Sequence, residues 1–315
     1  MTGNQGITPV YDHPPPSSLL KHPNMSAINV NEPLIISAPL ANDWSKKLCL
    51  SHGDGACNYY HGFWQYLRLL GLGSTLGGHP QEYLREFRDL SRQWTGATKR
   101  VLISGCADYS MLAHLIKGFA ESHCIAEFTA LDQCMTPLTL NEWYAQRVGV
   151  SIHTVCSDVL SYQPSKGFDL IVTSSFLGYF SDEERPSLFR KFRELLNPGG
   201  VLIFSNRLRP HVAVKTDSFS HEDTLRLMNA VVERSDLLPP DFAIDKHELR
   251  SMAGTYAKRR TPYPVRSVQE IETLSQAAGL RIESSRIISN PSGKVIVNGP
   301  TLNDGSGYVM VRLSC

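Results

Sequence analysis

The sequence predicts a doubly wound α/β domain on a seven-stranded, mainly parallel sheet, with a helical cap before the sheet and a helical insertion after its fifth strand. From Lys99 onward, short apolar runs typical of strands alternate with helical patterns. Such alternation favours right-handed crossovers and a parallel sheet covered on both faces. At 315 residues, with 42% hydrophobic residues, the chain can bury a full core. The expected strands are 99–105, 126–132, 151–158, 168–175, 200–206, 280–289 and 307–314.

Three segments are expected along the chain. Residues 1–40 are rich in Pro, Asn and Ser, without a sustained hydrophobic period, and are predicted to form a flexible arm. Residues 41–98 contain helical patterns near 43–50, 58–71 and 80–94 and are predicted to form the cap. Residues 99–315 form the sheet domain, which is interrupted at 207–264 by an insertion with helical patterns at about 221–235 and 245–258. This insertion is expected to add a second cap element.

Local capping patterns support the helices between the strands. Thr136-Pro137 is typical of a helix start, and Ser267 with Glu270 has the spacing of a capping box. Gly279 is placed to close the last helix in the left-handed conformation. Each pattern agrees with a helix packed against the predicted sheet.

Charge and cysteine usage exclude several classes of function. The sequence contains thirty-one Lys and Arg and thirty Asp and Glu residues, so its net charge is +1. This balance disfavours a nucleic-acid or anionic-membrane partner. The start of the chain lacks a signal-peptide pattern and the apolar runs are too short to span a bilayer, so a cytoplasmic location is expected. Seven cysteines without CxxC spacing and histidines without an HExxH pattern predict no metal. The oligomeric state is not readable.

Polar residues at the carboxyl ends of the strands indicate the ligand site, because open parallel sheets bind ligands there. Asp132 ends the second strand and can accept both hydroxyls of a ribose. Asp158, after the third strand, has two interpretations, as an acceptor from an adenine amino group or as a turn residue. Ser174 and Ser175 follow the fourth strand, and Ser205 lies at the end of the fifth.

The loop after the first strand separates two classes of cofactor. A dinucleotide-binding loop needs the pattern GxGxxG, and only its first glycine, Gly105, is present. S-adenosylmethionine carries no phosphate and needs only a tight turn. The segments VLISGC, LDQC, CSDVLSY, FDLIVTSSFLGYF and LFRKFRELLNPGGVLIFSN resemble the Rossmann-like class I S-adenosylmethionine-dependent methyltransferases. The resemblance covers about 99–206 well and 265–314 in outline.

The resemblance implies a set of cofactor-binding residues. They are Gly105, Cys106, Ala107, Tyr109, Asp132, Gln133, Ser157, Asp158, Ser174 and Ser175. The chain departs from the family pattern on the methionyl side, where Ile103 replaces an acid and Ala107 and Tyr109 replace glycines. Either the turn is intact despite these changes, or Tyr109 reshapes how the methionyl arm lies.

Catalytic candidates are aromatic and polar residues expected near the sulfonium. Aromatic faces attract such a cation by about 0.5–2 kcal/mol each. The candidates are Tyr59, Tyr60, Asn141, Tyr179 and Ser205. For the cap tyrosines the alternative is an apolar helix stripe, and for Asn141 an exposed helix position. Lys258, Arg259 and Arg260 are interpreted as a solvated helix end.

The predicted function is an S-adenosylmethionine-dependent methyltransferase acting on a small molecule enclosed by the caps. The alternative is a branch similar to azetidine-2-carboxylate synthases, in which the aminocarboxypropyl arm of the cofactor cyclises and methylthioadenosine is released. The altered loop at Tyr109 favours this alternative. A cofactor-binding partner protein without catalysis is a third possibility, and an NAD enzyme is disfavoured by the missing glycines.

Overall fold

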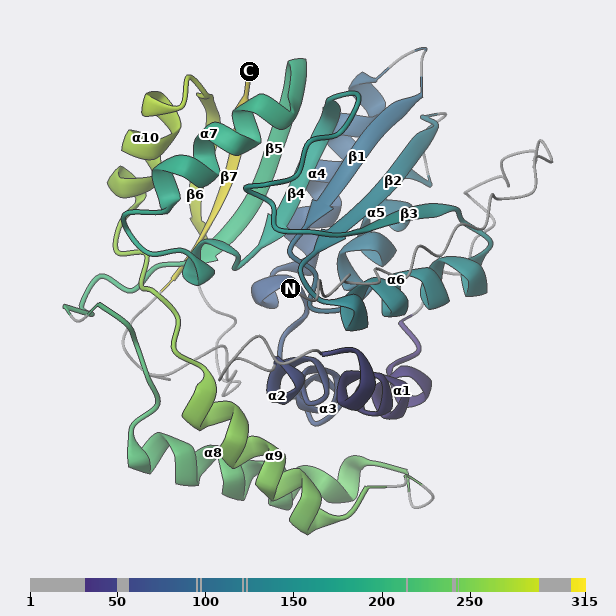
Figure 1. Cartoon of the computed structure of the whole chain (residues 1–315), viewed down its shortest axis with the longest axis vertical. Coiled ribbons are helices and arrows are strands. Elements are labelled where there is room, and N and C mark those ends of the chain that lie inside the picture. The colour runs from purple at the N-terminus through teal and green to yellow at the C-terminus, as the bar shows by residue number, and fades with distance from the viewer. Residues whose placement is uncertain are drawn as a thin grey trace, which may run out of the picture.

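The computed structural model of the chain describes residues 32–49, 57–94, 96, 98–120, 122, 124–213, 215–239, 242, 244–288 and 307–315. Within them, seven strands form one sheet in the order β3-β2-β1-β4-β5-β7-β6 (Figure 1). The strands are β1 Lys99–Ser104, β2 Ala126–Asp132, β3 Ile152–Cys156, β4 Phe168–Ser174, β5 Leu196–Arg207, β6 Arg281–Ile288 and β7 Tyr308–Ser314.

The sheet is parallel except at one edge, where β7 runs antiparallel to both β5 and β6. Strand β1 pairs in parallel with β2 on one side and with β4 on the other, and β5 continues in parallel from β4. The chain therefore reverses its direction of winding between β1 and β4, which is where such sheets bind ligands. The predicted α/β fold class, with seven strands, a cap and an insertion, is confirmed.

Helices cover both faces of the sheet because neighbouring strand residues point to opposite sides. On one face, Val101 and Ile103 share a hydrophobic cluster with α4 (Pro80–Gln93), α5 (Ser110–Phe119) and α6 (Met135–Val148). On the other face, Leu102 packs in a cluster with α7 (Arg185–Leu195) and α10 (Val268–Ala277). Each fully buried Leu, Ile, Val or Phe contributes about 1.5–3 kcal/mol.

Helix α4 belongs to the sheet layer, whereas the sequence analysis assigned its residues to the cap. Its Tyr83, Phe87 and Leu90 are buried in the same cluster as Val101. The Tyr83 hydroxyl donates to the carbonyl of Thr173 at the end of β4, at 2.6 Å, and accepts from the Ser205 amide of β5 at 2.7 Å. Its amphipathic pattern is the same whether a helix covers a sheet or another helix, so the pattern alone did not reveal its partner.

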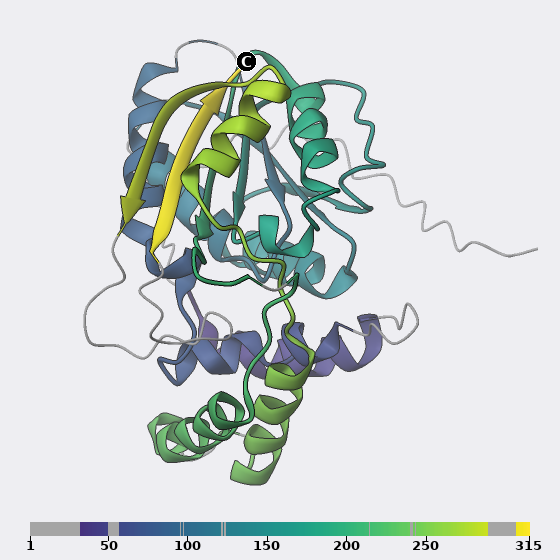
Figure 2. The same cartoon turned by 90° about the vertical axis from the view of Figure 1, so that its left-hand side faces the viewer.

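The caps lie together at one end of the sheet (Figure 2). The N-terminal part contains α1 (Leu34–Leu48), α2 (Asn58–His61) and α3 (Trp64–Leu69), and the insertion contributes α8 (His221–Arg234) and α9 (Lys246–Arg259). Apolar residues from both parts form a third cluster, to which α3 gives Leu67, α8 gives Val231 and α9 gives Tyr256. Among the described residues, no helix has both the length and the apolar character needed to cross a membrane.

Two cap helices differ from their predicted bounds. Helix α1 begins at Leu34, so the end of the predicted 1–40 arm is helical, and residues 1–31 of that arm lie outside the described residues. Pro39 lies inside this helix, and such a residue normally disfavours a helix interior. The predicted helix 58–71 is divided at Gly62, where a Cβ would lie 2.5 Å from Ser45 Oγ. Gly62 therefore lets α2 approach α1 closely.

Candidate functional site

The loop after β1 turns at Gly105, the first residue of the predicted cofactor loop. Gly105 has a φ of +72°, in the left-handed region, and its amide donates to the Leu131 carbonyl of β2 at 2.9 Å. A Cβ at this position would lie 2.3 Å from a ring carbon of Phe176, which follows β4. Positive φ and the nearby ring both disfavour any other residue. The sequence signal at Gly105 thus corresponds to a real constraint on the backbone.

Asp132 ends β2 and holds the cofactor loop in place. Its Oδ2 accepts the amide of Cys106 at 2.8 Å, and its Oδ1 accepts the amide of Cys134 at 2.8 Å. Burial raises the pKa of Asp132 to about 6, although His61 and the two amide donors favour the ionised form. Each carboxylate oxygen has a second lone pair. The carboxylate can therefore position the loop and still accept a hydroxyl from a ligand.

The other predicted nucleoside contacts lie at the ends of β2 and β3. Gln133 is exposed directly after β2, and the Ser157 amide donates to the Asp132 carbonyl at 2.9 Å. Asp158 Oδ1 accepts the amide of Leu160 at 2.8 Å, as in an Asx turn. The turn interpretation of Asp158 therefore accounts for one of its oxygens. All three residues lie on the same edge of the sheet as Asp132.

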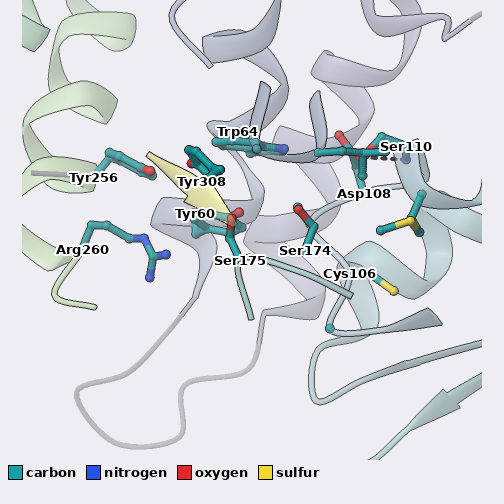
Figure 3. Close-up of a pocket in the computed structure, with 15 residues that line it drawn as sticks. Tyr60, Trp64, Cys106, Asp108, Ser110, Ser174, Ser175, Tyr256, Arg260 and Tyr308 are labelled. Carbon is teal, nitrogen blue, oxygen red and sulfur yellow. Dashed lines mark hydrogen bonds between the residues drawn. The ribbon is translucent and has the colours of Figure 1, made fainter. Parts of the chain in front are cut away.

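A pocket lies where the cofactor loop, the end of β4 and the caps meet (Figure 3). The loop and the start of α5 contribute Gly105, Cys106, Ala107, Asp108, Ser110 and Met111, and β4 contributes Ser174 and Ser175. The remaining lining residues come from the caps, the turn before α4 and β7; they are Tyr60, Trp64, Leu76, Gly77, Tyr256, Arg260 and Tyr308. The structure therefore brings Tyr60 together with five of the predicted cofactor-binding residues.

Ser175 has an unusual backbone conformation at the pocket wall. Its φ is +54°, although it is not glycine, and its amide donates to the Ser205 carbonyl at 2.8 Å. A strained residue of this kind costs about 1–3 kcal/mol and is kept in place by its surroundings. The strain lies at the end of β4, where the predicted site begins.

Aromatic rings and one arginine form the cap side of the pocket. Tyr60 stacks on Trp64, with ring centroids 5.5 Å apart, and on Tyr256, at 6.1 Å. The guanidinium of Arg260 lies 5.7 Å from the Tyr60 centroid and 4.7 Å from that of Tyr179. Figure 3 shows this guanidinium pointing from the end of α9 toward the pocket. Arg260 is therefore not part of a solvated helix end, which corrects the interpretation made from the sequence.

Arg260 remains cationic in this position. Burial lowers the pKa of Arg260, but the neighbouring tyrosine hydroxyls, with Tyr179 first, outweigh it and raise the pKa. In the part of the chain that the structure describes, no carboxylate forms an ion pair with Arg260. A partly buried cation facing a pocket favours an anionic group on the bound molecule.

Tyr109 does not face the pocket. Its ring is fully buried and stacks on Tyr144, with centroids 4.5 Å apart and planes at 6°. Its hydroxyl lies 2.8 Å from Ser37 Oγ of α1. Of the two interpretations of this loop, the structure therefore supports the one in which the turn is intact, and only the backbone of Tyr109 lies near the site.

Asn141 and Ser205 also act away from the pocket surface. Asn141 is fully buried, which differs from an exposed helix position, and its Nδ2 donates to the carbonyls of Pro137 at 2.8 Å and Asp108 at 3.3 Å. The Ser205 hydroxyl is buried against the Tyr83 hydroxyl at 3.0 Å. Asn141 thus stabilises the cofactor loop through its hydrogen bond to the Asp108 carbonyl, and Ser205 connects β5 to α4 through its contact with Tyr83.

The two remaining catalytic candidates, Tyr59 of the cap and Tyr179 after β4, differ in position. Tyr59 packs on the apolar cluster of the caps, and Arg259 lies 5.1 Å from its ring centroid. Tyr179 is 47% exposed and contacts the pocket through Arg260. The apolar-stripe interpretation therefore applies to Tyr59, while Tyr60 lines the pocket.

The sequence analysis missed a buried ion pair beneath the loop. Arg68 of α3 donates to Asp108 Oδ2 at 2.6 Å, and both side chains are almost fully buried. Burial raises the pKa of Asp108, but Arg68 and the hydrogen bonds from Ser110 outweigh it, so this pKa lies below its usual value. An arginine between leucines in the run YLRLL was the available signal, because a charged residue in an apolar stripe needs a partner. The pair ties the cap to the cofactor loop.

Comparison with known proteins gives one family match and a set of similar folds. Residues 101–200 match the family model described as a methyltransferase domain. The fold is similar to that of an S-adenosylmethionine-dependent methyltransferase from Clostridium acetobutylicum, with 12% identity, a TM-score of 0.50 and coverage of 79% of this chain and 95% of that chain. Comparison with curated protein sequences gives no significant match.

Two further solved structures have lower scores. One is the 1,6-didemethyltoxoflavin-N1-methyltransferase of Burkholderia thailandensis, with 15% identity, a TM-score of 0.45 and coverage of 74% of this chain and 77% of that chain. The other is an S-adenosylmethionine-dependent methyltransferase of Mesorhizobium loti, with 18% identity, a TM-score of 0.47 and coverage of 76% and 100%. At such identities the likeness concerns the fold alone.

Proposed function

We propose that the chain, whose residues 101–200 match a methyltransferase-domain family model, is a class I S-adenosylmethionine-dependent methyltransferase that transfers a methyl group to a small-molecule acceptor carrying an anionic group. The observation that supports this most is the pocket itself. It joins the loop Gly105 to Asp108 with the end of β4 on one side and with the cap residues Tyr60, Tyr256 and Arg260 on the other. A nucleoside cofactor and a second molecule can therefore meet there.

S-adenosylmethionine fits the residues of this edge of the sheet. Gly105 turns the loop at positive φ and allows the Phe176 ring to lie against it, which holds the loop backbone in one course beside the pocket. Asp132 keeps one lone pair on each oxygen for ribose hydroxyls, beside Gln133 and Ser157. The cofactor supplies an electrophilic methyl carbon bonded to a positively charged sulfur.

The cap residues provide the conditions that methyl transfer needs. Stacked rings of Tyr60, Trp64 and Tyr256 form an apolar wall that excludes water. Holding the acceptor atom about 3–3.5 Å from the methyl carbon in a dry pocket supplies much of the rate without an essential base. Arg260 binds the anionic group of the acceptor and so orients it. The net charge of +1 agrees with a small acceptor rather than nucleic acid.

The role of Arg260 is tested by kinetics on acceptors identified from a panel of small carboxylic acids and their neutral amides. Formation of S-adenosylhomocysteine should require an acceptor and should be faster with the acid. Arg260→Gln should raise the acceptor KM about 10- to 150-fold, from the loss of a charge-assisted hydrogen bond worth about 1.5–3 kcal/mol. Lys258→Gln, at an exposed position in the last turn of α9, is the matched control and should leave KM unchanged. Equal KM values in both variants would remove Arg260 from acceptor binding.

The cyclase alternative remains distinguishable by its products. In that reaction the cofactor's amine attacks its own γ-carbon, the carbon–sulfur bond breaks, methylthioadenosine leaves, and the amine proton passes to water. The feature that favoured it, Tyr109 at the methionyl side, is directed into the core against Tyr144. Enzyme and S-adenosylmethionine alone should therefore give no methylthioadenosine above the control without enzyme. Stoichiometric methylthioadenosine in a mass-spectrometric time course without acceptor would replace the methyltransferase with the cyclase.

A further inference from the structure

Three cysteines and a histidine from distant parts of the chain converge between the N-terminal cap and the sheet domain. They are Cys49, Cys57, His61 and Cys134, and their three sulfurs and one ring nitrogen all lie within 4.8 Å of one another. Cys49 Sγ is 3.4 Å from Cys134 Sγ and 3.5 Å from His61 Nδ1. The sequence analysis expected no metal, because the cysteines lack CxxC spacing. The fold supplies the proximity that the spacing does not.

We propose that these four residues bind one zinc ion as a structural site. Zinc prefers four cysteine and histidine ligands in a tetrahedron, with bonds of about 2.3 Å to sulfur and about 2.0–2.1 Å to nitrogen. These bond lengths place neighbouring ligand atoms about 3.6–3.8 Å apart, close to the observed separations. A disulfide needs its sulfurs at about 2.05 Å, and the three cysteines of the cluster are free thiols.

The backbone directs the four ligands toward one point. Cys57 and His61 are four residues apart at either end of α2, and this spacing places both on one helix face. Cys49 follows the last residue of α1, and Cys134 precedes the first residue of α6. The pattern Cys57-x3-His61, with Cys49 eight residues before Cys57, is the sequence signal that could have revealed the site.

The surroundings of the cluster suit a closed structural site. Four protein ligands leave no open position for a substrate or water. Thr136 Oγ1 lies 3.1 Å from Cys49 Sγ and can donate a hydrogen bond to a bound thiolate. Cys134 is buried, and its position at the start of the 14-residue helix α6 favours a thiolate.

A zinc ion here would link the cap to the nucleoside side of the site. Cys134 is two residues after Asp132 and donates its amide to Asp132 Oδ1 at 2.8 Å. Cys49 directly follows α1, and His61 lies in α2 beside Tyr60 of the pocket wall. Metal binding would therefore fix α1 and α2 against the loop that orients the Asp132 carboxylate. This inference is independent of which reaction the enzyme catalyses.

Metal analysis of the full chain, purified with a non-thiol reductant from cells grown with added zinc, tests the proposal. Elemental mass spectrometry should find about one zinc per chain. After dialysis against a chelator, the variants Cys49→Ser and Cys134→Ser should each hold at most about one tenth of the zinc that the wild type holds. Cys156→Ser removes an exposed cysteine outside the cluster and should retain zinc as the wild type does.

Two measurements on the wild type keep the test valid if the serine variants fail to fold. Cobalt substituted for zinc should show the absorption of tetrahedral cobalt with thiolate ligands. Removing the metal should lower the Tm, and adding zinc should restore it. A wild-type chain with no bound zinc and no thiolate–cobalt absorption, or a Cys49–Cys134 disulfide in peptide mapping, would overturn the proposal. Metal content is measured without S-adenosylmethionine, so a zinc protein that transfers no methyl group would contradict only the proposed function.

Discussion

Replacing Gly105 with alanine perturbs the cofactor loop at one atom, and the chain offers a close control. Gly105 and Gly149 both have a φ of +72°. A Cβ at Gly149, after α6, would meet nothing within 4 Å, whereas one at Gly105 would lie 2.3 Å from the Phe176 ring. The two alanine variants therefore share the backbone strain and differ in the close approach to Phe176.

The expected magnitudes follow from these two contributions. A left-handed alanine costs about 1–2 kcal/mol. At Gly149 that cost is partly offset by the smaller entropy of the unfolded alanine chain, about 0.4–1 kcal/mol, so the free energy of unfolding should fall by about 1 kcal/mol. At Gly105 the ring must also retreat by about 1.2 Å to reach a normal carbon contact of about 3.5 Å. Such overpacking adds about 1–3 kcal/mol, for an expected total of about 2–4 kcal/mol at Gly105.

Urea unfolding and titration calorimetry measure both variants against the wild type. Gly105→Ala should also weaken S-adenosylmethionine binding at least about tenfold, which corresponds to about 1.4 kcal/mol. Gly149→Ala should leave the Kd unchanged. In the Phe176→Ala background, Gly105→Ala should cost no more stability than Gly149→Ala does, because the two changes share one contact. Equal losses of stability in the two glycine variants would refute the close approach of the ring.

Three further substitutions test single groups of the site. Asp132→Asn should weaken S-adenosylmethionine binding by about 1.5–3 kcal/mol, the worth of hydrogen bonds to a charged group, and an unchanged Kd in a folded variant would exclude a ribose contact. Tyr109→Phe should lower the free energy of unfolding by about 1 kcal/mol through the lost contact with Ser37 and leave the Kd unchanged; weaker binding at full stability would instead place Tyr109 in the pocket. Arg68→Met should cost about 3–5 kcal/mol near pH 7, because it leaves the buried Asp108 carboxylate without its counter-charge. With Arg68 present, the folded pKa of Asp108 is depressed, so its stabilisation is present above the unfolded pKa of about 3.9 and is lost as pH falls through the folded pKa. The loss caused by Arg68→Met should therefore shrink as pH falls, because a protonated Asp108 needs no partner, and a loss independent of pH in urea unfolding would contradict this account.

The sheet was predictable because its central strands are short, continuous apolar runs that are buried on both faces and alternate with helical patterns. The cap was less predictable, because its helices depend on tertiary contacts. Pro39 disfavours a helix interior in any local reading, yet it lies within α1. Gly62 interrupts a long amphipathic pattern because α1 packs against its backbone. Neither event can be read from hydrophobic periodicity.

The loop and strand-end residues near the pocket were easier to predict than its cap residues, for a physical reason. Gly105 and Asp132 act through the ends of their own strands, and sequence position fixes where a strand ends. Arg260 and Tyr256 reach the pocket only because α9 packs on α2 and α3, which lie almost 200 residues earlier. The cluster of three cysteines and His61 was missed for the same reason, because Cys134 comes close to Cys49 only after the cap has folded onto the sheet domain.

The two cap segments act as one structural unit, and this changes where the cap can be divided from the sheet domain. Tyr60 of α2 stacks on Tyr256 of α9, so the pocket wall exists only when both segments are present. Helix α4 differs, because its Phe87 is buried against the sheet with Val101. A truncation after residue 94 would therefore expose one face of the sheet as well as remove the cap. A cut before Pro80 keeps that face covered, but it removes Arg68 and so leaves the buried Asp108 carboxylate without its counter-charge.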